Sequence, residues 1–110
     1  MKIIQINSDN LKQYIKTPTL YFHDSHVQSF EYANNMLKIV FEKFDKTIVS
    51  VVFNNVSKIE YRIGDSSEID LNDRILDVDI KTINDRLMVN ILMFNMSFID
   101  IFCYSINYVC

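Results

Sequence analysis

The sequence predicts a mainly β fold with a minor α+β element: an antiparallel meander that forms a sandwich or a partly closed barrel, with one short N-terminal helix. Three observations lead to this prediction. From residue 27 onward, apolar and polar side chains alternate with a period of two. Asn-rich and Asp-rich turn signals separate these runs. Hydrophobic residues make up 49% of the 110 residues and charged residues 23%, which fits a single globular domain over residues 1–110.

A short strand and a single helix are expected near the N-terminus. Residues 3–6 are apolar except for one glutamine, as in a brief strand. Residues 11–15 are apolar at positions i, i+3 and i+4, which predicts a helix, and Ser8 or Asp9 can cap its start. Pro18 ends this helix, because the residue before a proline is pushed out of the α region.

Four strands follow, separated by turn signals. We expect the strands at residues 27–32, 36–42, 48–53 and 57–63. The third strand is apolar on nearly both faces, which predicts a central position in a sheet. The fourth alternates strictly, which predicts a half-buried antiparallel strand. The turns between them are Ala33-Asn34-Asn35, Phe44-Asp45-Lys46 and Asn54-Asn55.

Beyond these strands, the only glycine, Gly64, opens the most polar segment of the chain, where we expect the longest loop. A strand at residues 75–83 follows, and a tight turn at residues 84–85 leads to a strand at residues 87–94. One last strand is expected from residue 98 to about residue 108. In the strand at 75–83, the side chains expected to point inward are Leu76, Val78 and Ile80, and those expected to point outward are Asp77, Asp79 and Lys81.

Both faces of the last strand are apolar, since Phe102 opposes Ile101 and Cys103. Either the strand is central in its sheet, or another chain covers one face, and the second alternative predicts a homodimer through the C-terminal strand. Cys103 is expected to be a buried, reduced thiol, and neither it nor Cys110 has a second cysteine at metal-ligand spacing.

Charge and hydropathy disfavour two classes of partner. The net charge is -3 and the lysines and arginines are scattered, so nucleic-acid binding and docking to anionic membranes are not expected. Residues 1–8 contain too short an apolar run for a signal peptide. The apolar stretch at residues 87–103 includes Asp100, which would be costly inside a membrane. We therefore expect a cytoplasmic protein.

Both histidines of the chain lie in the segment Tyr21-Phe22-His23-Asp24-Ser25-His26. In an extended backbone, Asp24 and His26 share one face, so a carboxylate and an imidazole could line a pocket or bind a metal with help from elsewhere. In the alternative interpretation, Asp24 and Ser25 close an Asx or Ser turn that leads into the first long strand, His23 bonds to the backbone, and Tyr21 and Phe22 pack beneath.

An acidic set, Glu68, Asp70, Asp77 and Asp79, is a candidate surface for a basic protein partner. Three members of this set, together with Asn72, can also be laid on the ligand positions of a calcium-binding loop. The glycine that such a loop requires is Asp73, and flanking helices are absent from the prediction, so a solvated loop and strand face is favoured.

The sequence offers no recognisable catalytic set. Serine catalysis would need a nucleophile elbow and glycines that frame an oxyanion hole, and a phosphate-binding loop would need more than one glycine. Asp77 and Asp79 lie on one strand face, whereas opposed catalytic carboxylates come from different elements across a cleft. We therefore expect no enzyme activity, no cofactor and no metal site.

Three segments resemble a group of small bacterial β-rich proteins, some of them immunity proteins of polymorphic toxin systems. The segments are Phe-His-Asp-Ser at residues 22–25, residues 35–39, and residues 48–56, which end in Phe-x-Asn-Val. The resemblance covers residues 21–63 and implies a cytoplasmic, non-catalytic binding protein. The abundance of Ile, Asn and Lys is in addition typical of a low-GC bacterium.

Three hypotheses of function follow. The first is a non-enzymatic protein-binding module, an immunity-like inhibitor that covers a basic toxin domain through the acidic set. The second is a metal-dependent or small-molecule-binding enzyme centred on His23, Asp24 and His26. The third is a structural homodimer without a ligand.

Overall fold

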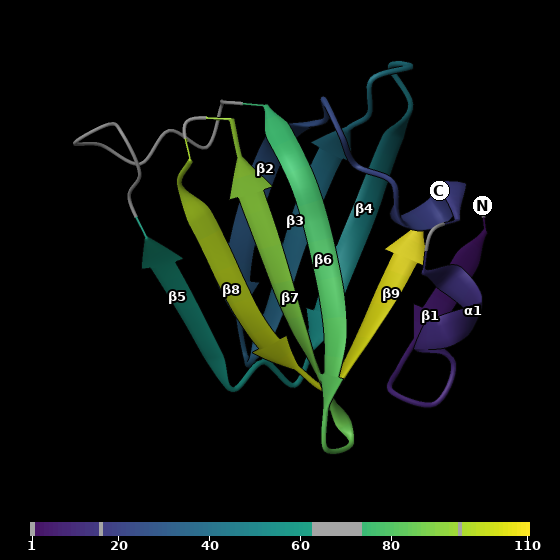
Figure 1. The fold of residues 1–110 in the computed structure, drawn as a ribbon, viewed down its shortest axis with the longest axis vertical. Coiled ribbons are helices and arrows are strands. Elements are labelled where there is room, and N and C mark those ends of the chain that lie inside the picture. The colour runs from purple at the N-terminus through teal and green to yellow at the C-terminus, as the bar shows by residue number, and fades with distance from the viewer. Residues whose placement is uncertain (1, 16, 63–73, 95) are drawn as a thin grey trace.

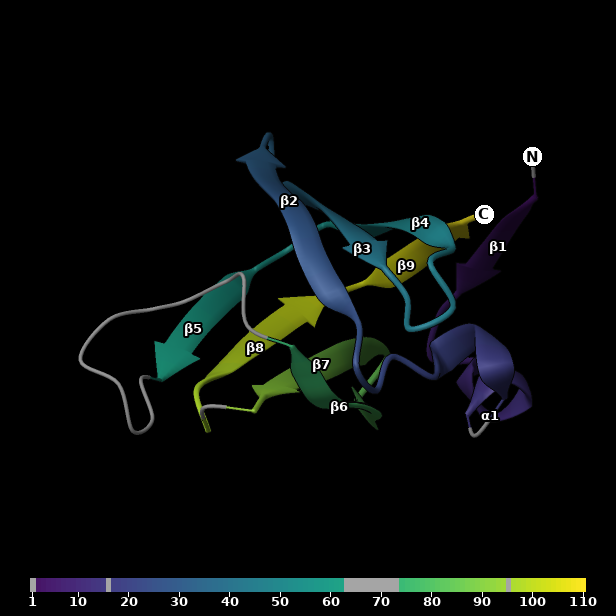
Figure 2. The same cartoon turned by 90° about the horizontal axis from the view of Figure 1, so that it is seen from above.

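Two antiparallel sheets face each other as a sandwich, which confirms the predicted fold class (Figures 1 and 2). The structure is a computed structural model that describes residues 2–15, 17–62, 74–94 and 96–110. The five-stranded sheet has the order β1-β9-β4-β3-β2, formed by β1 (Ile3–Ile6), β2 (His26–Ala33), β3 (Met36–Glu42), β4 (Ile48–Asn54) and β9 (Ser105–Val109). The four-stranded sheet has the order β5-β8-β7-β6, formed by β5 (Lys58–Arg62), β6 (Ile75–Ile83), β7 (Arg86–Met93) and β8 (Phe98–Cys103).

The predicted helix is present as α1 (Leu11–Tyr14). Its cap differs from the prediction, because the residue at the start of the helix is Asn10 rather than Ser8 or Asp9, and its side chain makes no capping bond. Instead, the Asn7 Oδ1 atom accepts bonds from the backbone N–H groups of Asp9 (2.9 Å) and Asn10 (3.1 Å), which fixes the turn before the helix. In the described part of the chain, no helix is long and apolar enough to cross a membrane.

The core lies between the sheets and follows the period of two in the sequence. Alternate residues of the central strands point inward and are almost fully buried, whereas their neighbours are half-buried or exposed. Burying each such side chain contributes about 1.5–3 kcal/mol through the hydrophobic effect. The inward residues of these strands are Leu37, Ile39, Phe41, Val49, Val51, Phe53, Leu87, Val89, Ile91, Met93, Ile99, Ile101 and Cys103.

The single strand predicted for residues 98–108 is wrong in one respect, because it is two strands in different sheets. β8 pairs with β5 and β7, the chain bends at Tyr104, and β9 then pairs with β1 and β4. A second bend, between β4 and β5, lies beside the bend at Tyr104. Asn55 in this second bend has a positive φ of 53°. Backbone bonds from Tyr104 to Asn54 (2.9 Å) and from Ser57 to Phe102 (2.8 Å) hold the two bends together. The pair of bent strands thus joins the two sheets along one side.

The C-terminal segment is central in both sheets, and one of its two apolar faces packs against the core. β8 and β9 each have a strand neighbour on both sides, which is the central position offered as the first alternative. Ile101 and Cys103 face the core from β8, and Ile106 and Tyr108 face it from β9. The homodimer stays a prediction.

Most predicted turns are present. Asn34 and Asn35 have φ of 54° and 60°, Lys46 has 73° and Asn84 has 57°, all in the left-handed region that asparagine tolerates better than most residues. The polar segment after Gly64 and the residue at position 63 lie outside the described residues.

A β-bulge corrects the predicted inward set of β6. The pairing with β7 shifts between Ile75 and Asp77, so Leu76 is an extra residue in the ladder. As a result Ile75 is completely buried, and Leu76, which was expected to point inward, is half-buried. From Asp77 onward the alternation follows the prediction.

Candidate functional site

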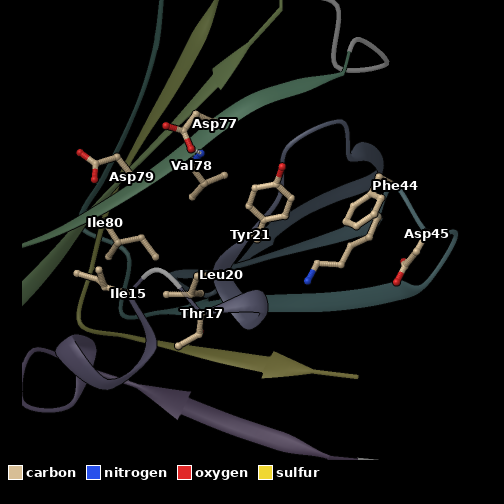
Figure 3. Close-up of a pocket in the computed structure, with 11 residues that line it drawn as sticks. Ile15, Thr17, Leu20, Tyr21, Phe44, Asp45, Asp77, Val78, Asp79 and Ile80 are labelled. Atoms are coloured by element: carbon tan, nitrogen blue, oxygen red, sulfur yellow. Dashed lines mark hydrogen bonds between the residues drawn. The ribbon is translucent and has the colours of Figure 1, made fainter.

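A groove of about 780 Å³ lies between three separate parts of the chain. One wall is the segment that includes the 3₁₀ helix η1 (Pro18–Leu20), the second is the β3–β4 turn, and the third is the outer strand β6 (Figure 3). Its volume lies within the range of roughly 300–1,000 Å³ that is typical of ligand sites. We call it the β6 groove, and its lining residues are Ile15, Thr17, Leu20, Tyr21, Lys43, Phe44, Asp45, Asp77, Val78, Asp79 and Ile80.

Two exposed aromatic rings form one lip of the β6 groove. Tyr21 is 51% exposed and Phe44 is 60% exposed. Their rings meet edge to face, with centroids 6.0 Å apart and an angle of 85° between the planes. Since burying apolar surface is favourable, a hydrophobic lip left in water is a common mark of a binding surface. Tyr21 was predicted to pack beneath the histidine segment, and that prediction is wrong.

Lys43 also lines the β6 groove and is held by aromatic neighbours. Its Nζ atom donates a hydrogen bond to the Tyr108 hydroxyl (3.1 Å) and lies 5.1 Å from the centre of the Phe22 ring. Burial lowers the pKa of Lys43, an effect that the nearby carboxylate of Asp45 opposes. Burial also raises the pKa of Tyr108. The lysine is therefore engaged with groups of its own chain.

Three carboxylates give the groove its charge. Asp45 lies in the β3–β4 turn, where its Oδ1 atom accepts a bond from the backbone N–H of Thr47 (3.0 Å), and hydrogen bonds from Thr47 hold the pKa of Asp45 below its usual value. Asp77 and Asp79 are exposed on β6, and their side chains alternate with those of Val78 and Ile80 (Figure 3). An acidic margin thus surrounds an apolar floor.

The backbone of β6 turns hydrogen-bonding groups away from β7 beside the groove. β6 is the last strand of its sheet, and its pairing with β7 ends in a two-residue turn between Ile83 and Arg86. In such a hairpin the residues that flank the turn bond to each other, so the alternate residues Thr82, Ile80 and Val78 turn their N–H and C=O groups outward. The Val78 N–H donates to the Oδ1 atom of Asp77 (2.9 Å), as expected for an amide that faces away from β7.

The histidine segment covers the first part of this same edge. Asp24 and Ser25 exchange backbone bonds with Ile75, from Asp24 N to Ile75 O and from Ile75 N to Ser25 O, both 2.8 Å long. The Nδ1–H of His23 donates to the carbonyl of Leu76 (2.7 Å), since a carbonyl can only accept. His26 forms a bridge with Arg74. The segment therefore ties the start of β2 to the start of β6 and joins the sheets on the side opposite the bent strands.

His23, Asp24 and His26 lie in and just after a turn, as in the second interpretation, but the bond that closes the turn joins backbone atoms rather than the Asp24 or Ser25 side chain. Ser25 N bonds to Phe22 O (3.0 Å), and Asp24 has a φ of 64°, the left-handed region in which aspartate is tolerated. Asp24 lies 3.4 Å from Arg74 Nη1 and 3.6 Å from His23 Nε2. Within the described ranges, no group of three or more His, Cys, Asp or Glu side chains is placed to hold a metal.

Sequence reasoning found two of the groove residues and missed others. Asp77 and Asp79 belong to the predicted acidic set and lie at the groove, whereas Glu68 and Asp70 lie outside the described residues. Neither Tyr21 nor Phe44 was predicted to line a binding site. The only signal for Phe44 was a large apolar residue inside a turn, where burial is unusual.

The comparisons with known proteins add no identity. No family model matches the chain, and no curated protein matches it.

Proposed function

We propose that the protein is a non-enzymatic binding module that holds a basic protein partner in the β6 groove. The observation that carries this proposal is the combination of two exposed aromatic rings, packed edge to face, with three carboxylates around one hollow. Interface cores are enriched in aromatic residues that fill pockets, and charges at the margin select a partner of opposite sign. Immunity-like inhibition of a bacterial toxin is the specific form of this proposal, and it rests on the resemblance of residues 21–63.

Charge balance supports a basic partner. Lys43 is the one cation among the groove residues, and it is bonded to Tyr108 and lies over an aromatic ring. The carboxylates of Asp77 and Asp79 are exposed on the outer strand, where a partner can reach them. A cation placed between them would gain Coulomb energy that falls as salt is added.

The test is capture of a partner from extracts of the protein's own cells. We expect the wild-type chain to retain a defined protein, and Asp77→Lys combined with Asp79→Lys to lose it. Asp85→Lys is the matched control, because it reverses an exposed charge in the β6–β7 turn, outside the groove lining. Retention should weaken between about 50 mM and about 500 mM salt. Equal retention of the same protein by all three chains would refute the proposal.

A second arm tests the aromatic lip. Replacing Tyr21 and Phe44 by serine removes exposed apolar surface and leaves the buried core in place. Because aromatic anchors often carry most of the energy of an interface, we expect the purified partner to bind at least about tenfold more weakly. Ile48→Ser, at an exposed apolar residue outside the groove lining, serves as the control.

A further inference from the structure

The outer edge of β6, together with the groove beside it, indicates which backbone conformation a ligand would have. We infer that the partner supplies an extended segment with alternating apolar and basic residues, which adds to β6 as a further strand. This inference rests on the proposed function and specifies how its site is used. Peptide recognition by strand addition draws its affinity from main-chain hydrogen bonds and its specificity from alternate side-chain positions.

The part of the β6 edge with which a ligand could pair begins beyond the residues that the histidine segment covers. Ile75 already bonds to Asp24 and Ser25, and the Leu76 carbonyl accepts from His23. Beyond the bulge, the next outward N–H, that of Val78, bonds to the side chain of Asp77. The positions that follow, from the Val78 carbonyl to Thr82, have no strand neighbour among the described elements, and the groove lies beside the first of them, at Val78 and Ile80. A strand added about 4.8 Å from β6 would therefore lie in the groove.

The side chains of β6 dictate the pattern of the ligand. Val78 and Ile80 point toward Tyr21 and Leu20 on the groove side, whereas Asp77 and Asp79 occupy the other face of the strand (Figure 3). In a sheet, directly opposed side chains project on the same face and contact each other. Residues of the ligand opposite the valine and isoleucine must therefore be apolar, and those opposite the aspartates must be basic.

The probe is an acetylated, amidated octapeptide in which lysine and valine alternate. We expect it to bind the full chain in solution, as followed by nuclear magnetic resonance of the backbone amides. A peptide with glutamate in place of lysine should bind at least about tenfold more weakly. Replacing Asp79 by Lys should have a similar effect on the lysine peptide, whereas Asp85→Lys should not.

Two N-methylated versions of the probe decide between strand addition and simple groove binding. One carries N-methyl groups on all valines and the other on all lysines. Because only alternate residues of an added strand bond to its neighbour, one version should lose at least about tenfold in affinity and the other should bind far better. On the protein, bound peptide should slow hydrogen exchange at Ile80 and Thr82, while Asp79 and Lys81, which face β7, change little.

The outcomes distinguish failure of strand addition from failure of the proposed function. A difference between the two N-methylated peptides, with protection at alternate residues of β6, supports strand addition. Equal binding by both methylated peptides overturns strand addition and leaves a groove that binds basic, apolar ligands. Absence of binding by the unmethylated probe also overturns strand addition, and the capture experiment then judges the proposed function separately.

Discussion

The thiol of Cys103 makes the stability of the fold sensitive to alkaline pH. Cys103 is 0% exposed and is the last residue of β8. Burial raises the pKa of this thiol from 9.0 to about 12, although Arg86 acts weakly in the opposite direction. The folded protein therefore keeps the thiol neutral at a pH where the unfolded chain ionises it.

The size and sign of the effect follow from linkage between ionisation and folding. Because the folded pKa lies above the unfolded value, the stability is fully present below about pH 9 and is lost as the pH rises toward about 12. At about pH 10 the unfolded thiol is roughly ten parts thiolate to one part thiol, so the free energy of unfolding falls by about 1.4 kcal/mol. The loss reaches about 4 kcal/mol where both states are ionised.

Urea unfolding at several pH values measures this loss. The chain for comparison carries Cys103→Ala, and both chains carry Cys110→Ser so that only one thiol differs. Tyr61 and Tyr108, whose pKa values burial also raises, lower stability at still higher pH in both chains. The difference between the two slopes against pH therefore isolates Cys103, even though the alanine variant is less stable at every pH.

Thiol reactivity gives an independent measurement. In the native wild-type chain, a thiol-specific reagent should label exposed Cys110 quickly and reach Cys103 only through unfolding. The reasoning fails if both chains lose stability equally between pH 8 and about pH 10, or if two thiols react quickly in the folded protein.

Substitutions at three further positions test the fold. Ile101→Ala empties a fully buried position and should lower the free energy of unfolding by about 2–5 kcal/mol in urea titrations; a loss well below this would mean that the core is not packed as described. His23→Ala removes the bond to the Leu76 carbonyl, and it should cost about 1 kcal/mol and speed amide exchange at Ile75, whereas unchanged exchange would contradict the link between β2 and β6. Asn34→Ala should cost about 1 kcal/mol because its φ is 54°, while Asn34→Gly should cost less, and the reverse order would exclude a left-handed turn.

The strands and turns were predictable because their causes are local. A side-chain period of two reports which face of a strand is buried, and it does so wherever the pairing is regular, as in β3 and β4. Asparagine pairs mark turns because asparagine tolerates positive φ, as at Asn34 and Asn35. The bulge at Leu76 was not visible, because an extra residue changes the phase of the pattern without changing its composition.

The exchange of strands between the sheets was not predictable in the same way. The choice of sheet depends on partners distant in sequence, as in the pairing of β1 with β9. One local signal did exist. The buried positions of β8 are odd, ending at Cys103, whereas the apolar buried positions of β9 are Ile106 and Tyr108, so the phase changes at the bend near Tyr104. A continuous run of apolar residues hides such a change, because either phase then appears buried.

The groove depends on tertiary contacts even more strongly. Asp77 and Asp79 could be proposed from their charge, but Tyr21 and Phe44 become neighbours only when the chain before β2 folds against the β3–β4 turn. Exposure of an aromatic ring cannot be derived from its identity, since aromatic residues are buried more often than not.

The histidine segment covers the start of the β6 edge and also contributes a residue to the wall of the groove. His23, Asp24 and Ser25 bind the edge of β6 as far as Leu76, and Tyr21, two residues before His23, extends into the groove. Because unpaired strand edges invite aggregation, a chain gains by covering them. Here the cover ends where the groove begins, and the first outward amide beyond it is bonded to an aspartate of its own strand. The histidine segment, which the second hypothesis takes as the centre of an enzyme site, therefore fixes one end of β6 and positions one wall of the groove.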